Sequence, residues 1–487
     1  MAYMNKTIEE IHDALVNGEV TSEELVREAL DKAHTVNDEY NAFVTIIDNA
    51  QKGEVTDELL SGIPYAAKDL YSTKGILTTG SSNTLKDYVP FIDATATKKL
   101  SQKGAVDIGK TVCDEFGMGA YGNTGHTGEV LNPWDKKRSC RGSSAGSACA
   151  VASGVIPYAL GTDTGDSIRH PAAYCGIVGY KPTYGMISRY GVLPYASSLD
   201  HCGVLARSVK DCAIVVDAMK GIDEKDMTTW DSSDIHLYTS LNGDVTGKKL
   251  CYIKELCDID NYPNASLELK EHLKNFKEVL EKIQSLGISV EEVSVDRDLI
   301  NAISSVYNVI AYSEATSNLS NMTGIVFGPR SDGSTYAEMM KNFRTKNFSP
   351  LIKRRFIIGS YVLQAENKER YFTNAQRARR MIVDAWNGLF AKYDAVIAPV
   401  GSNGPAKYLD MSKNITDDSL VPLEEHLQVA NFGGFPSISI PDGFIDNLPV
   451  ALNITGKCYD DENVLNIAFA IENLLGYKGQ IAKEVSK

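Results

Sequence analysis

The pattern of apolar and polar residues at the start of the chain predicts two helices followed by a strand. Thr7 and Thr21 each stand three residues before a glutamate, which is the capping-box arrangement of a helix N-terminus. After Thr21, apolar residues recur at helical spacing, as at Leu25 and Ala29. Residues 42–47 then form an apolar, β-branched run that predicts a strand and opens an alternation of helices and strands.

The pattern changes twice along the rest of the chain. From about Gly62 to Gly221 the sequence is rich in Gly, Ser, Thr and Ala, with short apolar runs, and beyond Gly247 it is more charged and helical. In this last part the predicted elements are strands at 249–253, 288–295, 394–399, 436–441 and 449–454, and helices at 267–286 and 462–475.

These elements predict an α/β fold with a single large mixed β-sheet that helices flank on both faces. No internal repeat divides the chain. We therefore expect residues 1–60 to be a helical segment packed on the core and residues 61–480 to form one compact unit.

The composition supports a large ordered core and argues against direct binding of nucleic acid. The chain has 487 residues, 43% of them apolar and 23% charged, which are ordinary values for a globular protein. Its net charge of −14 argues against a broad basic surface for nucleic-acid phosphates. If RNA is involved, a partner should hold it.

Cysteine usage and the apolar segments indicate a cytoplasmic protein. The nine cysteines lie far apart without a C-x-x-C pair, so we expect neither a disulfide framework nor a metal site. The start of the chain lacks the pattern of a signal peptide. The small and apolar stretch 145–160 contains Gly154 and Pro157 and is too short to span a bilayer, so we expect no membrane association.

The densest chemical signal is a Gly/Ser-rich block made of three segments. They are Arg141-Gly-Ser-Ser-Ala-Gly-Ser147, Gly161-Thr-Asp-Thr-Gly-Asp-Ser-Ile-Arg169 and Gly179-Tyr-Lys-Pro-Thr-Tyr-Gly185. Glycines between serines let backbone N–H groups turn toward one point, which suits an anion or oxyanion. Ser143 and Ser144 could also cap a following helix. A flexible loop with capping serines explains this block alone equally well.

Other readings of the block lack their structural context. Ser144 lies in a G-x-S-x-G match, but no apolar strand precedes it, as a nucleophile elbow requires. His126, His170 and His201 stand in no recognisable catalytic-triad setting. The G-x-G-x-x-G match at 117–122 lacks a preceding strand and a following helix.

Lys68 lies in a predicted short strand among small and apolar neighbours. Partial desolvation would lower its pKa and make it a candidate base. The alternative is a structural lysine that pairs with Asp69.

Together, Lys68, Gly142-Ser143-Ser144 and Thr164-Gly-Asp-Ser-Ile-Arg169 have an order and spacing that resemble the amidase signature family. The resemblance extends through Tyr190-Gly-Val-Leu-Pro-Tyr-Ala-Ser-Ser-Leu-Asp200 and, more loosely, over nearly the whole chain. It implies the amidase signature fold for residues 61–480. It also implies that Ser167 is the nucleophile, Ser143 a bridging serine, Lys68 the base and Gly142–Ser143 a cis peptide.

The chemistry that this resemblance implies sets further conditions. Lys68 can accept a proton only when neutral, so its pKa must fall by roughly three units from about 10.4, and Asp69 must point away. Backbone N–H groups of Thr164, Gly165 and Asp166 would stabilise the oxyanion.

Within the family, the chain resembles the glutaminase subunits of tRNA-dependent amidotransferases. The similar segments are 180–191, 313–319, 353–355 and 431–436. This implies hydrolysis of glutamine to glutamate and ammonia, which amidates Glu-tRNA(Gln), Asp-tRNA(Asn) or both on a partner. The B and C subunits of the amidotransferase would be the partners, tRNA would bind through them, and ATP and Mg²⁺ would be used there, with no cofactor in this chain.

The same resemblance points to residues for glutamine binding. Arg355, with Arg354 as second choice, would bind the α-carboxylate, because a guanidinium pairs with a carboxylate through two hydrogen bonds. Glu424 stands near an aspartate of the relatives and would bind the α-amino group, and Tyr307 matches a substrate-contacting tyrosine.

Two alternatives stay open: a free-standing amidase for another small carboxamide, and a catalytically inactive paralogue that survives as a structural subunit. The second is motivated by Arg141 and Asp166, which stand where the family usually has glycine. Their opposite charges predict an ion pair in which Arg141 holds the Asp166 carboxylate away from the oxyanion. Independent drift of the two positions is the competing explanation.

Overall fold

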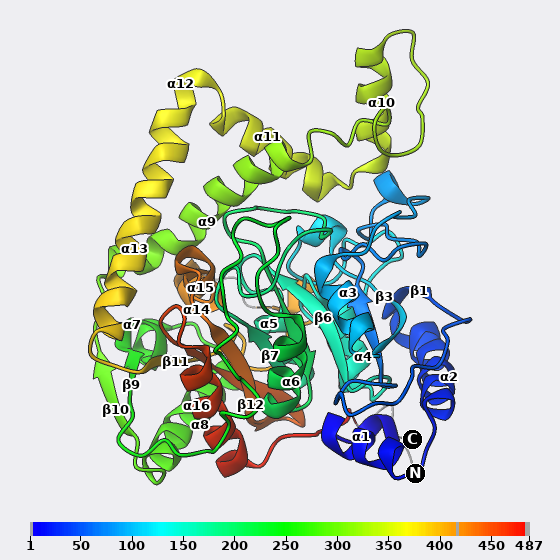
Figure 1. Cartoon of the computed structure of the whole chain (residues 1–487). Helices are drawn as coiled ribbons and strands as arrows, with labels where there is room; N and C mark the ends of the chain where they lie inside the picture. The colour runs from blue at the N-terminus through cyan, green and yellow to red at the C-terminus, as the bar shows by residue number, and fades with distance from the viewer. Residues whose placement is uncertain (1–2, 415–417, 483–487) are drawn as a thin grey trace.

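The computed structural model describes residues 3–414 and 418–482. One mixed β-sheet lies at the centre of the fold (Figure 1). Eleven strands of the described chain form it, in the order β1 (Phe43–Ile46), β3 (Val106–Thr111), β2 (Pro64–Lys68), β6 (Tyr158–Asp163), β8 (His201–Ala206), β7 (Val178–Lys181), β12 (Ser437–Ile445), β13 (Leu448–Thr455), β11 (Ala395–Pro399), β9 (Lys249–Ile253) and β10 (Ser289–Val293). β2 runs parallel to β3 and β6, and β9 parallel to β10 and β11, whereas the other neighbours are antiparallel. The sheet is therefore mixed, as the sequence predicts. A separate hairpin pairs β4 (Leu131–Asn132) with β5 (Asp135–Ser139).

Helices cover both faces of this sheet and extend beyond it (Figure 1). α4 and α5 contact each other and the central strands, while α6 packs on β7 and β8 and contacts α3 and α16. The α-helices are α1 (Ile8–Val16), α2 (Ser22–Tyr40), α3 (Thr95–Gln102), α4 (Ala145–Ala152), α5 (Arg169–Cys175), α6 (Val209–Met219), α7 (Lys254–Cys257), α8 (Leu267–Gln284), α9 (Arg297–Asn318), α10 (Tyr336–Asn347), α11 (Pro350–Val362), α12 (Ala365–Lys368), α13 (Asn374–Phe390), α14 (Val421–Glu425), α15 (Gln428–Gly433) and α16 (Asp461–Leu475).

The N-terminal segment begins with the two predicted capping boxes. Thr7 and Thr21 each accept a hydrogen bond from the backbone of the glutamate three residues on, and that glutamate bonds back. The apolar faces of α1 and α2 are buried in the main core. β1 then joins the edge of the sheet beside β3, so this segment contributes a strand as well as helices.

Two parallel central strands bring the candidate catalytic segments together. β2 is buried along its whole length and ends at Lys68. Its neighbour β6 ends at Asp163, directly before the Thr164–Ser167 turn. Because the carboxyl ends of parallel strands meet at the same edge of a sheet, Lys68 and this turn lie close together.

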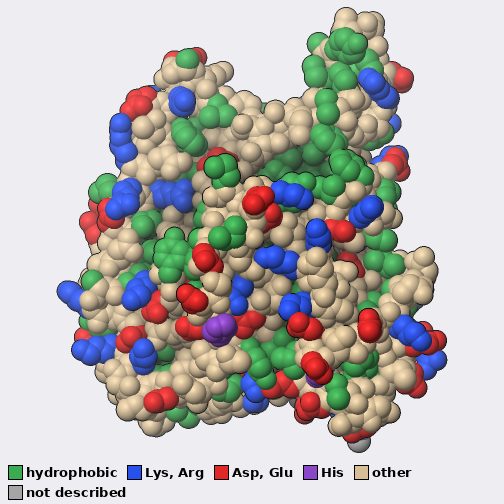
Figure 2. Space-filling model, viewed as in Figure 1, with side chains coloured by type: hydrophobic (Ala, Val, Ile, Leu, Met, Phe, Trp, Pro, Cys, Tyr) green, Lys and Arg blue, Asp and Glu red, His purple; other side chains and the backbone are tan. Residues whose placement is uncertain are grey.

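The face of the molecule shown in Figure 2 carries side chains of both charges. Figure 2 shows Lys and Arg side chains mixed with Asp and Glu over the visible face. Among the described residues, no helix is both long and apolar enough to cross a bilayer, and no group of His, Cys, Asp and Glu side chains could hold a metal ion. All nine cysteines are free thiols.

We predict that Thr21→Ala lowers the stability of α2 by about 1 kcal/mol, since it removes the hydroxyl that accepts the Glu24 N–H hydrogen bond. Hydrogen exchange of amides in the first turn of α2 measures this directly. Thr35→Ala is the matched control. Thr35 is exposed in the same helix and bonds only to the carbonyl of Asp31, so its loss should change stability by less than about 0.5 kcal/mol. Equal protection in both variants would contradict the capping role.

Candidate active site

Lys68 is a fully buried lysine whose Nζ is surrounded by oxygen atoms. It donates to Ser143 Oγ at 2.7 Å, Ser144 Oγ at 2.9 Å and Thr162 Oγ1 at 2.8 Å. Burial lowers the pKa of Lys68 to about 8, because desolvation disfavours the ammonium form. A useful fraction of this side chain is therefore neutral near physiological pH and able to accept a proton.

The neighbouring carboxylate of Asp69 is turned away from Lys68, as the sequence analysis requires. It accepts hydrogen bonds from the N–H and hydroxyl of Thr79 and from the N–H of Ser81. Within the described chain, Lys68 takes part in no ion pair, and desolvation outweighs the more distant carboxylates of Asp114, Asp163 and Asp200, which favour the charged form.

The segment that carries Ser143 is held against the end of β3. The Gly142–Ser143 peptide is cis, as the family resemblance implies. A Cβ on Gly142 would lie 1.8 Å from Asp114 Oδ2, so a side chain does not fit there. The backbone N–H of Asp114 also donates to the carbonyl of Ser143 at 3.1 Å. These contacts fix the Ser143 hydroxyl beside Lys68.

Ser144 corrects one expectation. It is the N-cap residue of α4, but its hydroxyl makes no capping hydrogen bond. Instead, the hydroxyl accepts from Lys68 and lies 3.3 Å from the carbonyl of Thr162, to which it donates. The hydroxyl of Ser144 is therefore bound by Lys68 and the Thr162 carbonyl, and not by the backbone N–H groups at the start of α4.

Ser167 lies in the turn between β6 and α5, and this turn is rich in free backbone donors. Within the described residues, the N–H groups of Thr164, Gly165, Asp166 and Ser167 donate to no protein acceptor. The carbonyl of Ser167 accepts from the N–H of Ser144 at 3.3 Å, which ties the two serine segments together. No hydrogen bond joins the hydroxyls of Ser143 and Ser167 in this structure. Unpaired N–H groups of this kind are the donors that an oxyanion needs.

A buried arginine that the sequence analysis did not single out holds this turn. Arg169 binds both carboxylate oxygens of Asp163, the carbonyl of Gly165 and the side chain of Asn431. Burial opposes ionisation of Asp163, but Arg169 outweighs it, so the pKa of Asp163 lies well below its usual range. Because all partners are buried, this network fixes the course of the chain on both sides of Ser167.

The predicted pair of Arg141 and Asp166 is present and belongs to a larger cluster. Arg141 Nη2 lies 3.1 Å from Asp166 Oδ2, and its Nη1 lies 2.8 Å from Glu424 Oε1. Lys407 Nζ lies 3.1 Å from the same Glu424 oxygen, and His170 Nδ1 lies 3.1 Å from Asp166 Oδ2. The Asp166 carboxylate is therefore held by side chains and does not cover its own N–H.

Glu424 does not offer a free carboxylate to a substrate. Besides its two ion pairs, it accepts from the N–H and hydroxyl of Ser402. Burial opposes its ionisation, yet Arg141 and Lys407 lower the pKa of Glu424 well below its usual value. The sequence analysis expects Glu424 to bind an α-amino group. In the structure, however, Arg141 and Lys407 already neutralise this carboxylate.

Of the other two expected binding residues, Tyr307 lies at the turn, and Arg355 contacts Tyr195, which lines the cavity beside the turn. A Cβ on Gly165 would lie 3.0 Å from the ring of Tyr307, so this ring packs directly on the turn. Arg355 donates to the hydroxyl of Tyr195 at 3.2 Å and forms no ion pair within the described chain. Arg354 is exposed, which favours Arg355 as the carboxylate-binding residue.

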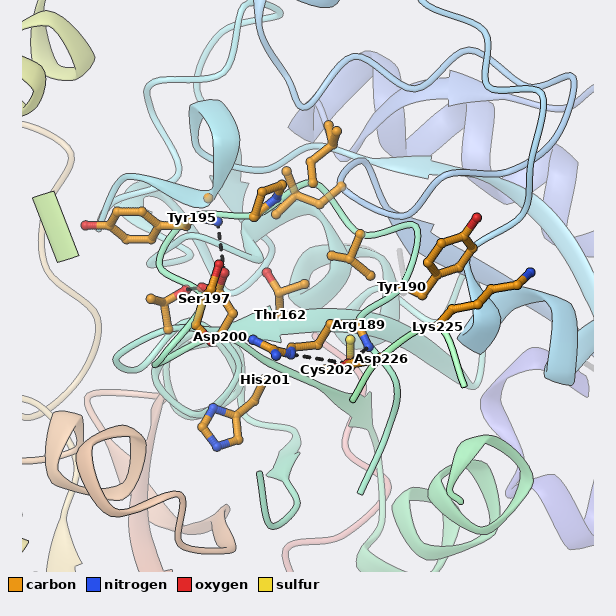
Figure 3. A pocket seen from close by; sticks show the side chains of 16 residues that line it. Thr162, Arg189, Tyr190, Tyr195, Ser197, Asp200, His201, Cys202, Lys225 and Asp226 are labelled. Carbon is orange, nitrogen blue, oxygen red and sulfur yellow. Dashed lines mark hydrogen bonds and ion pairs between the residues drawn. The ribbon is translucent and has the colours of Figure 1, made fainter. Parts of the chain in front are cut away.

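A cavity of about 210 Å³ lies against the same turn (Figure 3). Thr162, Thr164 and Tyr195 line it together with Asp200, whose carboxylate accepts from the Thr164 hydroxyl at 2.7 Å. Gly117 also lines it, and a Cβ there would lie 3.6 Å from Ser143 Oγ. The cavity therefore comes close to Ser143 on this side.

Comparisons with known proteins agree with this geometry. The family model described as Amidase matches residues 24–465. The chain belongs to the amidase family.

Several relatives of this amidase match over nearly their whole length. The A subunit of glutamyl-tRNA(Gln) amidotransferase from Latilactobacillus sakei is 38% identical over 97% of this chain and 96% of its own. The crystal structure of the same kind of subunit from Thermotoga maritima has a TM-score of 0.80 and 34% identity, covering 97% of this chain and 95% of that one. A peptide amidase from Stenotrophomonas maltophilia shares the fold, with a TM-score of 0.81 at 24% identity and 97% coverage of both chains.

In this amidase, no hydrogen bond joins His126, His170 or His201 to the hydroxyl of Ser143 or Ser167. His201 bonds to the carbonyl of Leu199 and His170 to Asp166. Burial lowers the pKa of His170, so this ring is neutral near pH 7 and serves as a partner of the Asp166 carboxylate.

We predict that Arg141→Gly lowers the turnover number for amide hydrolysis about ten-fold or more, because the freed Asp166 carboxylate then opposes the developing oxyanion. Asp166→Gly alone should cost less, and the double change should recover activity. A double-mutant cycle on the turnover number measures this coupling. Additive losses would show that the pair has no part in protecting the oxyanion.

Proposed function

We propose that this amidase is the glutamine-hydrolysing member of a tRNA-dependent amidotransferase, its A subunit, and that it uses Ser167, Ser143 and Lys68. The observation that carries the chemistry is the 2.7 Å hydrogen bond between the buried Lys68 amine and the Ser143 hydroxyl. The near full-length similarity to the A subunits of glutamyl-tRNA(Gln) amidotransferases supports the choice of substrate.

Serine needs a base to become a nucleophile, and the proposed base acts through a second serine. Neutral Lys68 accepts the proton of Ser143 while Ser143 accepts that of Ser167. Ser167 Oγ then bonds to the carboxamide carbon. The relay requires the Ser143 and Ser167 hydroxyls to come within hydrogen-bond distance when substrate binds. Catalytic hydrogen bonds are often longer without substrate.

The tetrahedral intermediate collapses when its C–N bond breaks. The relay runs in reverse and delivers the proton to the leaving nitrogen, which departs as ammonia. Water then attacks the acyl-enzyme by the same route and releases glutamate. Free N–H groups at Thr164, Gly165 and Asp166 would stabilise both oxyanions, at about 3–4 kcal/mol for each donor.

Arg355 is our proposed partner for the α-carboxylate of glutamine, with Tyr307 against the adjoining turn. A half-buried guanidinium that forms no ion pair with a described carboxylate favours an anionic ligand. This reaction needs neither a metal nor an organic cofactor in this chain.

We further propose that the ammonia is used on a partner. The B subunit would bind the aminoacyl-tRNA, with ATP and Mg²⁺, and would amidate Glu-tRNA(Gln), Asp-tRNA(Asn) or both, while a small C subunit would join the assembly. The net charge of −14 and the mixed charges on the face shown in Figure 2 favour tRNA binding through the partner. We propose that the complex acts in the cytoplasm.

One observation favours a second candidate, an amidase acting without partners on another small carboxamide. Glu424 is neutralised by Arg141 and Lys407, which differs from what glutamine recognition leads us to expect. The inactive-paralogue reading is disfavoured, since Lys68 and Ser143 are bonded and Arg141 holds the Asp166 carboxylate.

Lys68→Ala and Ser167→Ala should each lower amide hydrolysis at least about 10³-fold with the fold intact, because the first removes the base and the second the nucleophile. Ammonia release measures activity, and circular dichroism checks folding. His126→Gln and His201→Gln are matched controls that should keep substantial activity. Collapse in a histidine variant with an active Lys68→Ala would place the enzyme in another catalytic class.

The pH profile should report Lys68. Since burial lowers its pKa to about 8 and only the neutral amine is a base, kcat/KM should rise about ten-fold per pH unit below 8 and level off above it. Steady-state assays between pH 6 and 9 suffice. A profile governed by a group near pH 6.5 would point to histidine instead.

The glutaminase rate should rise at least about ten-fold when the B and C subunits and aminoacyl-tRNA are present, because the proposed reaction couples ammonia release to its use. Co-expression followed by size-exclusion chromatography and ammonia assays tests this. A monomer whose rate ignores both partners and tRNA would support the free-standing amidase.

A further inference from the structure

Two cations and two carboxylates beside Ser167 neutralise one another. Arg141 contacts both Asp166 and Glu424, and Lys407 contacts Glu424. All four side chains are buried, with Arg141 only 1% exposed. The cluster therefore has no net charge left for a ligand.

Further contacts hold this cluster in place. The N–H and hydroxyl of Ser402 donate to Glu424 at 3.0 and 2.6 Å. The Arg141 guanidinium lies 5.0 Å from the centre of the Tyr121 ring, and Lys407 Nζ lies 6.0 Å from the same centre. Since breaking a buried ion pair is costly, a substrate ammonium would not readily displace Arg141 from Glu424.

The charge of Arg355, which contacts the cavity-lining Tyr195, is not balanced. Arg355 is largely enclosed, its Nη1 donates to the neutral hydroxyl of Tyr195, and no described carboxylate lies within ion-pair distance. This guanidinium suits one carboxylate of a ligand.

Glu425, the next residue of α14, does not replace Glu424 as an anion. It forms no ion pair with a described residue, and its carboxylate accepts from the side-chain amide of Gln428. Burial and the nearby Asp166 raise the pKa of Glu425 to about 7. Near neutral pH this group is partly protonated, so the site has one free cation and no fully ionised free carboxylate among these residues.

We propose that Arg141 takes the place on Glu424 that a substrate ammonium would take, so that this amidase selects carboxamides with one carboxylate and does not require an α-amino group. Half-amides of short dicarboxylic acids are then substrates alongside glutamine. This proposal rests on the amide-hydrolysing function above and concerns only how the substrate is selected.

The test compares L-glutamine with glutaramate, which is glutamine without its α-amino group. Ammonia release by the complex with its partner subunits gives kcat/KM for each amide. We expect the two values to agree within about three-fold, whereas a carboxylate that bound the ammonium would favour glutamine about 10- to 100-fold. A damaged fold would lower both values together, so their ratio isolates selectivity.

The charge-balanced variant Arg141→Gly/Asp166→Gly should shift the ratio at least about five-fold toward glutamine, because Glu424 then keeps only Lys407. Glycine suits position 141, where φ is +63°. Asp166→Gly alone is the matched control, since Arg141 still occupies Glu424 and the ratio should not move.

Two results would overturn the proposal. A wild-type preference for glutamine above 30-fold that Glu424→Gln or Glu425→Gln removes would show that a carboxylate reads the ammonium, while the glutaminase function stands. Hydrolysis of neither amide would defeat the proposed function and this proposal with it. Hydrolysis of glutaramate alone would support the proposal and remove glutamine as the substrate.

Discussion

Lys68 is buried at the end of a central strand without a carboxylate to balance its charge, and the chemistry of this amidase depends on that arrangement. Three side-chain hydroxyls surround its Nζ, and Asp69 is bound elsewhere by Thr79 and Ser81. An ion pair in the same place would favour the ammonium form and remove the base. The parallel pairing of β2 with β6 brings this amine to the turn that carries Ser167.

The region around Ser167 achieves its charge balance with residues from distant parts of the chain. The ion pair of Arg169 with Asp163 holds the turn that carries Ser167. Next to this turn, Arg141 pairs with both Asp166 and Glu424. Because Asp166 is held by Arg141, a carboxylate directly before the nucleophile is compatible with free backbone donors for an oxyanion. The same arginine that makes this possible also occupies Glu424. The proposed protection of the oxyanion and the proposed selection of the substrate are thus linked through one guanidinium.

Local signals in the sequence predicted much of the fold. Capping boxes at Thr7 and Thr21 and the apolar runs of β9, β11 and β13 carry their own short-range information, and the structure confirms them. Residues 145–160 carry no such local signal, because their small apolar side chains show no clear periodicity. The structure divides it into α4 and the start of β6. Periodicity alone does not separate a buried helix from a buried strand.

The candidate site likewise contains residues that the sequence indicates and residues that only the fold brings together. The relay of Lys68, Ser143 and Ser167 is implied by the resemblance to the amidase signature family, whereas the opposite charges at Arg141 and Asp166 predict their pairing, which the structure confirms. Lys407 and His170 had no local signal, since their roles arise only when the fold brings them to Glu424 and Asp166. The sequence position of Ser144 is compatible with helix capping, and sequence spacing does not show that Lys68 binds its hydroxyl instead.

The most direct test of this account is to locate the acyl group during turnover. Rapid quenching of the enzyme with glutamine, followed by proteolysis and peptide mass spectrometry, identifies the acylated side chain. The account predicts a γ-glutamyl ester on Ser167 in the wild type and none in Lys68→Ala. An acyl group on Ser143, Ser144 or a cysteine, or an ester on Ser167 that forms equally fast without Lys68, would contradict it.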